Sequence, residues 1–96
     1  MDLPTKPGLY LDDPGEELWQ LRTDGLWQNV GRPLRFGGIE LYATPAEPVT
    51  SAELKRLDGP LRGGTYPRHP IDLMAVRVWH EGATRPEWPS ETWFEQ

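Results

Sequence analysis

The chain has 96 residues, a formal net charge of −5 at pH 7 and no cysteine. A chain of this length forms one small domain. Without a thiol, it can neither form a disulfide nor use cysteine as a nucleophile or metal ligand. Its negative charge opposes the phosphates of nucleic acids and of anionic membranes. The composition therefore excludes cysteine-dependent chemistry and disfavours both of these partners.

Five tryptophans are many for a chain of this length. Each indole can bury about 200 Å² of surface, so a few of them enlarge an otherwise small core. We expect Trp19, Trp27 and Trp79 to lie in that core. Even so, a domain of this size keeps a narrow margin of stability, on the order of a few kcal/mol.

The N-terminal part reads as an extended arm followed by a three-stranded stretch. Residues 1–7 contain Pro4 and Pro7, which forbid helix and weaken strand pairing. Residues 8–30 read as three short strands joined by two turns. The first turn, at 13–16, has proline in its second position and glycine in its third, which favours a type II turn.

The second turn, at Asp24 and Gly25, allows two strand registers. A two-residue loop would pair Arg22 with Trp27. A three-residue loop with Gly25 in the left-handed conformation would instead pair Leu21 with Trp27. The longer loop is favoured, because Leu21 and Trp27 then share one apolar face. That face also includes Trp19, and Leu18, Leu26 and Val30 are left on the more polar side.

Residues 34–41 predict a tight hairpin around Gly37 and Gly38, because a two-glycine loop suits the turns that join adjacent antiparallel strands. The apolar residues would fall on one face and opposite charges would meet on the other. The predicted pairs are Phe36 with Ile39, Arg35 with Glu40, and Leu34 with Leu41.

A short helix is predicted over about residues 51–58. Thr50 and Glu53 have the spacing of a capping box, and a Gly-Pro pair ends the segment. Such a helix is too short to persist alone. We therefore expect Leu54 and Leu57, three residues apart, to dock on the sheet.

The C-terminal part is expected to contain a loop, a long strand and a tail. Residues 61–70 are rich in glycine and proline and read as loop. Residues 71–79 read as the longest strand, and because both of its sides are largely apolar it should be central or covered on both faces. The whole pattern predicts an α+β fold, a small mostly antiparallel sheet of about five or six strands with one short helix. We expect a single β-rich domain over 1–82 and an acidic, aromatic tail over 83–96.

No residue pattern points to catalysis or to a bound cofactor. His69 and His80 lack any recognised metal-ligand spacing, so no metal site is predicted. The acidic pairs at 12–13 and 16–17 flank a turn, where we expect them to face water rather than a cleft that would shift their pKa values. The glycine pairs do not have the pattern of phosphate-binding loops. We therefore expect neither an enzyme nor a nucleic-acid-binding protein.

The tail is the candidate protein-binding segment. Tryptophan is common at interfaces because one residue brings area, rigidity and a hydrogen-bond donor. The same segment can instead wrap its own domain, and the sequence leaves both alternatives open. The residues chosen as the candidate binding site are Glu87, Trp88, Glu91, Trp93 and Phe94.

The opening pattern resembles a family of phage proteins. The similarity lies in residues 7–12, 18–21 and 24–27, and it covers the N-terminal third of the chain. These segments are similar to those of small uncharacterised accessory proteins from phages that infect actinobacteria. The resemblance implies a phage accessory protein that binds a host or virion protein, and it carries no catalytic residues.

Two functions follow as expectations. The first is a non-catalytic protein that binds a host protein and inhibits or redirects it. The alternative is a minor structural or assembly component of a virion, in which homo-oligomerisation stays open. The sequence contains no signal peptide, membrane-spanning run or lipidation motif. The expected location is therefore the host cytoplasm, with the virion as the alternative.

Overall fold

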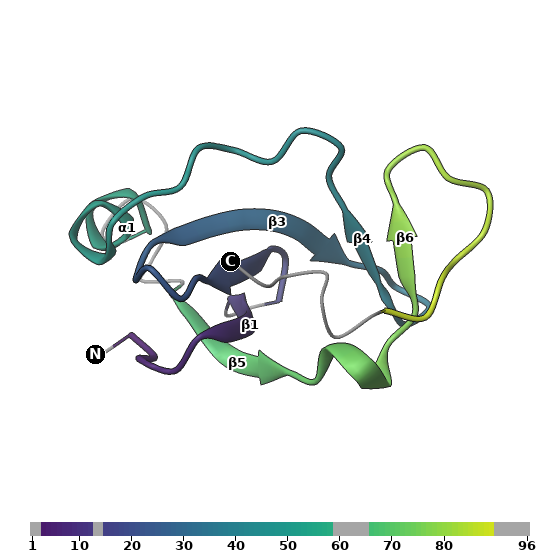
Figure 1. Cartoon of the computed structure of the whole chain (residues 1–96), viewed down its shortest axis with the longest axis horizontal. Helices are drawn as coiled ribbons and strands as arrows, with labels where there is room; N and C mark the ends of the chain where they lie inside the picture. Colours follow the sequence, from purple (N-terminus) through teal and green to yellow (C-terminus); the bar gives the residue numbers. More distant parts are fainter. Residues whose placement is uncertain (1–2, 13–14, 59–65, 90–96) are drawn as a thin grey trace.

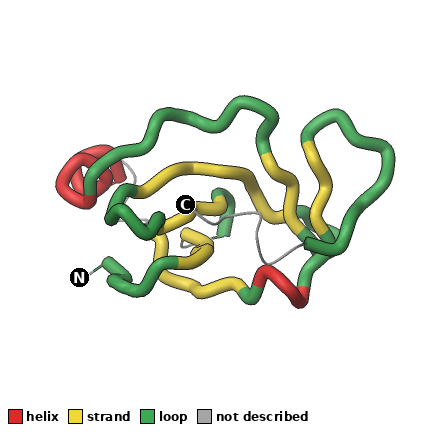
Figure 2. Tube along the Cα trace, viewed as in Figure 1, coloured by secondary structure: helices red, strands yellow, loops and turns green. Residues whose placement is uncertain are grey.

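The computed structural model of the chain describes residues 3–12, 15–58 and 66–89. Within these ranges, six strands form one sheet in the order β5-β1-β2-β3-β4-β6. Neighbouring strands are antiparallel except for the parallel pair β4 and β6 (Figures 1 and 2). The predicted small α+β fold is confirmed. The elements are β1 (Gly8–Asp12), β2 (Leu18–Leu21), β3 (Trp27–Pro33), β4 (Ile39–Leu41), α1 (Ser51–Asp58), β5 (Pro67–Ile71), the 3-10 helix η2 (Leu73–Ala75) and β6 (Val78–His80).

The three-stranded N-terminal stretch is β1, β2 and β3, as predicted. Leu21 lies opposite Trp27, which is the register favoured from the sequence. Gly25 has a φ of 85°, a left-handed conformation that glycine adopts without steric cost. The Arg22 carbonyl accepts the Gly25 N–H at 3.0 Å and closes the turn. The requirement for buried apolar residues therefore decided this register correctly.

The first turn is organised by Asp12, whose side chain the sequence placed in water. Asp12 is instead buried, with only 5% of its surface exposed. Its Oδ1 accepts the backbone N–H groups of Gly15, Glu16 and Glu17 at 3.1, 2.8 and 3.1 Å. The carboxylate is buried because it satisfies three donors that the turn would otherwise leave without partners. The central turn residues, Asp13 and Pro14, lie outside the described residues.

The sheet has an apolar cluster on each face. On one face, Trp27 is buried with Tyr10, Leu21 and Leu54. The opposite face was expected to be more polar, and that expectation is wrong for Leu18 and Val30. Both are buried there because η2 and the ends of β5 and β6 cover this face with apolar side chains. This second cluster consists of Leu9, Leu18, Val30, Ile39 and Val78, with Leu11, Leu41, Ile71, Leu73 and Val76 packed against it.

Trp27 connects the sheet to the segment that begins α1. Its backbone N–H and carbonyl both bond to Val49, each at 2.7 Å. Its indole N–H donates to the Ser51 Oγ at 3.2 Å, and its side chain is fully buried. The Tyr10 ring lies 5.8 Å away and is tilted by 58°. Backbone and side chain of this one residue therefore fix where the helix docks.

The predicted helix and its capping box are confirmed. The Thr50 Oγ1 accepts the Glu53 N–H at 3.1 Å, and the Glu53 Oε1 accepts the Thr50 N–H at 3.4 Å and the Thr50 hydroxyl at 3.1 Å. Leu54 is fully buried against the Trp27 face of the sheet. The expected docking of Leu57 lies outside the described side chains.

A hairpin forms around Gly37 and Gly38 as predicted, but its two-residue loop and its register are wrong. Strand β3 continues to Pro33, which pairs with Ile39, so residues 34–38 form a longer connection. In this register Gly31 lies opposite Leu41, where a Cβ on Gly31 would collide with the carbonyl oxygen of Glu40. The charge pair also changes, because the Arg32 Nε, not Arg35, contacts the Glu40 Oε1 at 2.9 Å. Phe36, predicted to lie on the apolar face, is 76% exposed.

The predicted long central strand over 71–79 is also wrong. The Asp72 Oδ1 accepts the Met74 N–H at 3.1 Å, and this cap begins η2 and interrupts the extended chain. The chain then crosses one face of the sheet from edge strand β5 to edge strand β6 (Figure 1). Part of the predicted loop over 61–70 is strand β5. Its prolines are tolerated because an edge strand needs no outward donor.

We predict that the buried indole contributes far more stability than an exposed one. Trp27→Ala should lower the free energy of unfolding by about 3–5 kcal/mol, because it leaves a core cavity. Trp88→Ala removes the same atoms from a surface position and should cost less than about 1 kcal/mol. Urea unfolding followed by circular dichroism measures both losses. Because Trp27→Ala removes much of the stability, Trp27→Phe provides a milder second variant, which should lie between them.

We also predict that Gly31 admits no side chain. Gly31→Ala should destabilise the protein by about 1–3 kcal/mol or more, because β4 must move away from β3. The matched control is Arg32→Ala in the same strand, which loses an exposed ion pair worth roughly 0.2–1 kcal/mol. Equal midpoints of thermal unfolding for the two variants would contradict this account of the β3–β4 register.

Candidate protein-binding groove

Two of the three large apolar side chains that are exposed in the described ranges lie over one groove. These two are Phe36 and Trp88, which are 76% and 65% exposed, and the third is Met74. The groove has a volume of about 280 Å³ and includes Trp79 on its wall. Single exposed apolar residues are ordinary, whereas their gathering in one place is typical of an interaction site.

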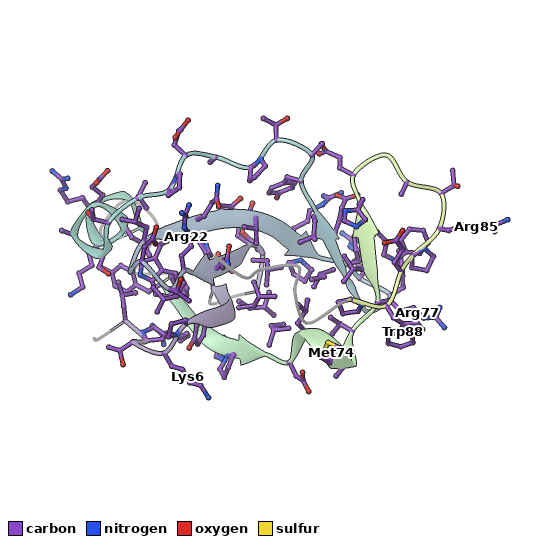
Figure 3. The ribbon with its side chains drawn as sticks, in the orientation of Figure 1. Lys6, Arg22, Met74, Arg77, Arg85 and Trp88 are labelled. Atoms are coloured by element: carbon purple, nitrogen blue, oxygen red, sulfur yellow. The ribbon has the colours of Figure 1, made fainter. Side chains whose placement is uncertain are left out.

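The groove lies at one end of the molecule. Figure 3 shows Trp88 and Arg77 side by side at the end occupied by β6, with α1 at the opposite end. We call it the aromatic groove and define it by its lining. It is lined by Phe36, Gly37, Gly38, Ala75, Val76, Arg77, Trp79 and Trp88.

The β3–β4 connection places Phe36 on the groove. Gly37 and Gly38 both have positive φ values, 92° and 84°, which turn the chain sharply after Phe36. A Cβ on Gly38 would lie 2.8 Å from the Arg77 carbonyl oxygen, so only glycine allows this close approach. The Ile39 N–H then bonds to the same carbonyl at 2.9 Å. The loop and the start of β6 are thus held together at the floor of the groove.

The aromatic rings are positioned by specific contacts. The Phe36 and Trp79 rings meet edge to face, with centroids 6.1 Å apart and planes at 83°, a favourable arrangement for aromatic pairs. The guanidinium carbon of Arg77 lies 5.8 Å from the centre of the Trp88 ring, within the range of a cation–π contact. These contacts orient the rings and leave Phe36 and Trp88 largely exposed.

Backbone pairing holds Trp88 in place. Its neighbour Glu87 pairs with Val78 through two bonds, Val78 N–H to Glu87 carbonyl at 2.9 Å and Glu87 N–H to Val78 carbonyl at 2.7 Å. Pro89, on the other side of Trp88, is buried. Trp88 is therefore anchored on both sides along the chain, and its exposed ring does not result from a loose end.

A second hollow adjoins the first at Phe36. It has a volume of about 420 Å³. Its charged residues are Glu16, Arg32 and Arg35. The Arg32 Nε forms a salt bridge with the Glu40 Oε1 at 2.9 Å. This hydrogen bond also raises the pKa of Arg32. The hollow is lined by Gly15, Glu16, Arg32, Pro33, Leu34, Arg35 and Phe36.

The histidines do not come together. His69 lies in β5 and His80 in β6, which are the two opposite edges of the sheet. The His80 Nε2 lies 3.6 Å from the Glu87 Oε2. Across the described ranges, no three His, Cys, Asp or Glu side chains gather closely enough to hold a metal ion.

A partly buried polar cluster forms around Glu17. The Glu17 Oε2 accepts the Tyr42 hydroxyl at 2.9 Å and the Asn29 side-chain amide at 3.1 Å. Burial, together with the bond to Glu17, raises the pKa of Tyr42 to about 12. The phenol therefore holds its proton at neutral pH, whereas a tyrosine that acts as a base needs a lowered pKa. The cluster ties the start of β2 to the end of β4 and is best explained as structural.

No protein-family model, curated protein or solved structure matches this chain. In the part of the chain that the structure describes, no helix is long and apolar enough to cross a membrane.

The predicted binding residues are only partly placed by the structure. Trp88 lines the aromatic groove, and the Glu87 side chain faces His80. The other three predicted residues, Glu91, Trp93 and Phe94, lie outside the described residues.

Sequence reasoning missed two residues of the groove. Phe36 was assigned to a buried hairpin face. Trp79 was assigned to the core, whereas it is partly buried and lines the groove. The available signal was Pro33, which can end a strand and allows a longer connection before Gly38.

We predict that Phe36 contributes little to stability. Phe36→Ser removes an exposed ring and one edge-to-face contact, so it should change the free energy of unfolding by less than about 1 kcal/mol. Urea unfolding monitored by circular dichroism checks this value. A loss as large as that of a core substitution would show that Phe36 is a structural residue, and it would remove the main argument for the groove.

Proposed function

We propose that this chain is a non-catalytic binding protein that docks on another protein through the aromatic groove. The observation that carries the proposal is the gathering of Phe36, Trp79 and Trp88 from three separate segments of the chain. Aromatic residues that cluster around a hollow are typical hot spots of protein interfaces. Phe36 and Trp88 remain 76% and 65% exposed.

The edges of the sheet favour binding in the groove over binding by addition of a partner strand to the sheet. Edge strand β5 contains Pro67 and Pro70, which lack the N–H groups that an added strand would need. At the other edge, Val78 of β6 already pairs with Glu87. A partner that pairs with the sheet backbone therefore finds few groups to bind, whereas the groove offers open aromatic surface.

The resemblance of the N-terminal third to phage accessory proteins bears on the partner class. It favours a host protein that this chain inhibits or redirects in the host cytoplasm. Trp93 and Phe94 of the predicted tail extend this proposal, because aromatic residues are enriched at interfaces, and Glu91 stays part of the proposed binding segment. A truncation that tests them should begin after Pro89, since Glu87 pairs with β6 and Pro89 is buried.

The proposal predicts a partner whose capture depends on Phe36. Wild type, Phe36→Ser and Met74→Ser are immobilised and exposed to lysate of an actinobacterium. We expect one protein to bind wild type and Met74→Ser and to lose at least about tenfold in affinity for Phe36→Ser. Met74 is the matched control, because it is a large exposed apolar residue that does not line the groove.

Two outcomes would count against this proposal. Equal capture by all three variants would remove the groove as the binding site. Recovery of the chain in purified phage particles, in many copies and with no cellular partner, would favour the virion component instead. Light scattering of the purified chain adds the oligomeric state, because a structural component that binds copies of itself should form larger assemblies.

A further inference from the structure

We infer that the partner presents an extended acidic segment whose apolar side chains occupy the two hollows on either side of Phe36. This inference rests on the proposed function and adds the chemistry of the partner. Phe36 belongs to the lining of both hollows, so a segment that covers its exposed ring contacts both. The two hollows therefore act as neighbouring subsites of one binding surface.

The two hollows offer volumes of about 280 and 420 Å³ to the side chains of a partner. Their walls combine apolar groups, from Pro33, Leu34, Val76 and Trp79, with four charged side chains. In an extended segment, side chains that point to the same side recur about every 6.6–6.8 Å. This spacing allows two apolar anchors to flank one aromatic ring.

The charge of the surface favours an acidic segment. The lining residues include three arginines, Arg32, Arg35 and Arg77, and one acidic residue, Glu16. Glu40 neutralises Arg32. Among the described residues, no carboxylate is placed in ion-pair range of Arg35 or Arg77. In a chain of net charge −5, the described lining residues therefore keep an excess of one positive charge after the Arg32–Glu40 pair and Glu16 are counted, which attracts acidic segments and repels basic ones.

Selection from a library of short random peptides tests the inference. The full-length chain is immobilised, and peptides that also bind Phe36→Ser are removed. We expect the enriched peptides to be net acidic and to carry two apolar residues close together. No enrichment, or enrichment of neutral or basic peptides, would overturn the inference.

Charge variants sharpen the test. Arg35→Glu and Arg77→Glu should weaken the best peptide by about tenfold each. Arg85→Glu makes the same charge change at an exposed arginine outside the groove and should have little effect. The affinity for wild type should also fall as salt is raised, because exposed charges are screened. Equal weakening by Arg35→Glu and Arg85→Glu would show that only net charge matters and would contradict the inference.

The outcomes separate this inference from the proposed function. Basic peptides that require Phe36 would keep the groove as the binding site and reject the acidic segment. A parallel selection without the removal step, in which every enriched peptide binds Phe36→Ser as well as wild type, would reject the groove itself. The test also covers a second copy of the chain as the occupant. Dimers that disappear with Phe36→Ser would show that the groove binds this chain, and would overturn the assignment to a separate partner.

Discussion

The fold depends on the burial of Trp27 at the junction of sheet and helix. Its backbone pairs with Leu21 on one side and with Val49 on the other. Its indole reaches Ser51, where α1 begins. In this small chain, Trp27 therefore combines three roles. It pairs with the backbone on both sides, covers one face of the sheet and contacts the start of the helix. The residues buried with it on this face are Tyr10, Leu21 and Leu54.

The opposite end of the sheet is built on close backbone approach instead of large side chains. Gly31 lets β4 lie against β3, and Gly38 lets the β3–β4 connection lie against the start of β6. In this register the Phe36 ring stands at the surface, in the same groove lining as Trp79 and Trp88. Among the described residues, Trp27 is buried at the end of the molecule that holds α1, and Phe36 and Trp88 are exposed around the groove at the other end.

The candidate site could be predicted only in part from the sequence. Trp88 was identified because it lies in an otherwise polar stretch, and an exposed tryptophan in such a stretch is typical of an interface. Phe36 was missed because the two glycines that follow it are equally compatible with a tight turn and with a longer one. The two possibilities differ in whether Gly31 or a larger residue faces Leu41. The local sequence does not reveal which residue pairs with Leu41. The observed pairing places Phe36 at the surface, whereas the predicted one placed it on the apolar face.

The sequence alone determined the α+β class, the three N-terminal strands and the capped helix over 51–58. Each of these depends on short-range chemistry, such as the left-handed Gly25 or the reciprocal bonds of Thr50 and Glu53. Only the tertiary structure decided that β5 and β6 lie at opposite edges and that Asp12 is buried beneath its turn. The apolar run after Ile71 favoured one strand, but the Asp72 cap divided it, and the segment that follows packs Leu73, Val76 and Val78 against the second face of the sheet, a long-range contact that local sequence does not reveal.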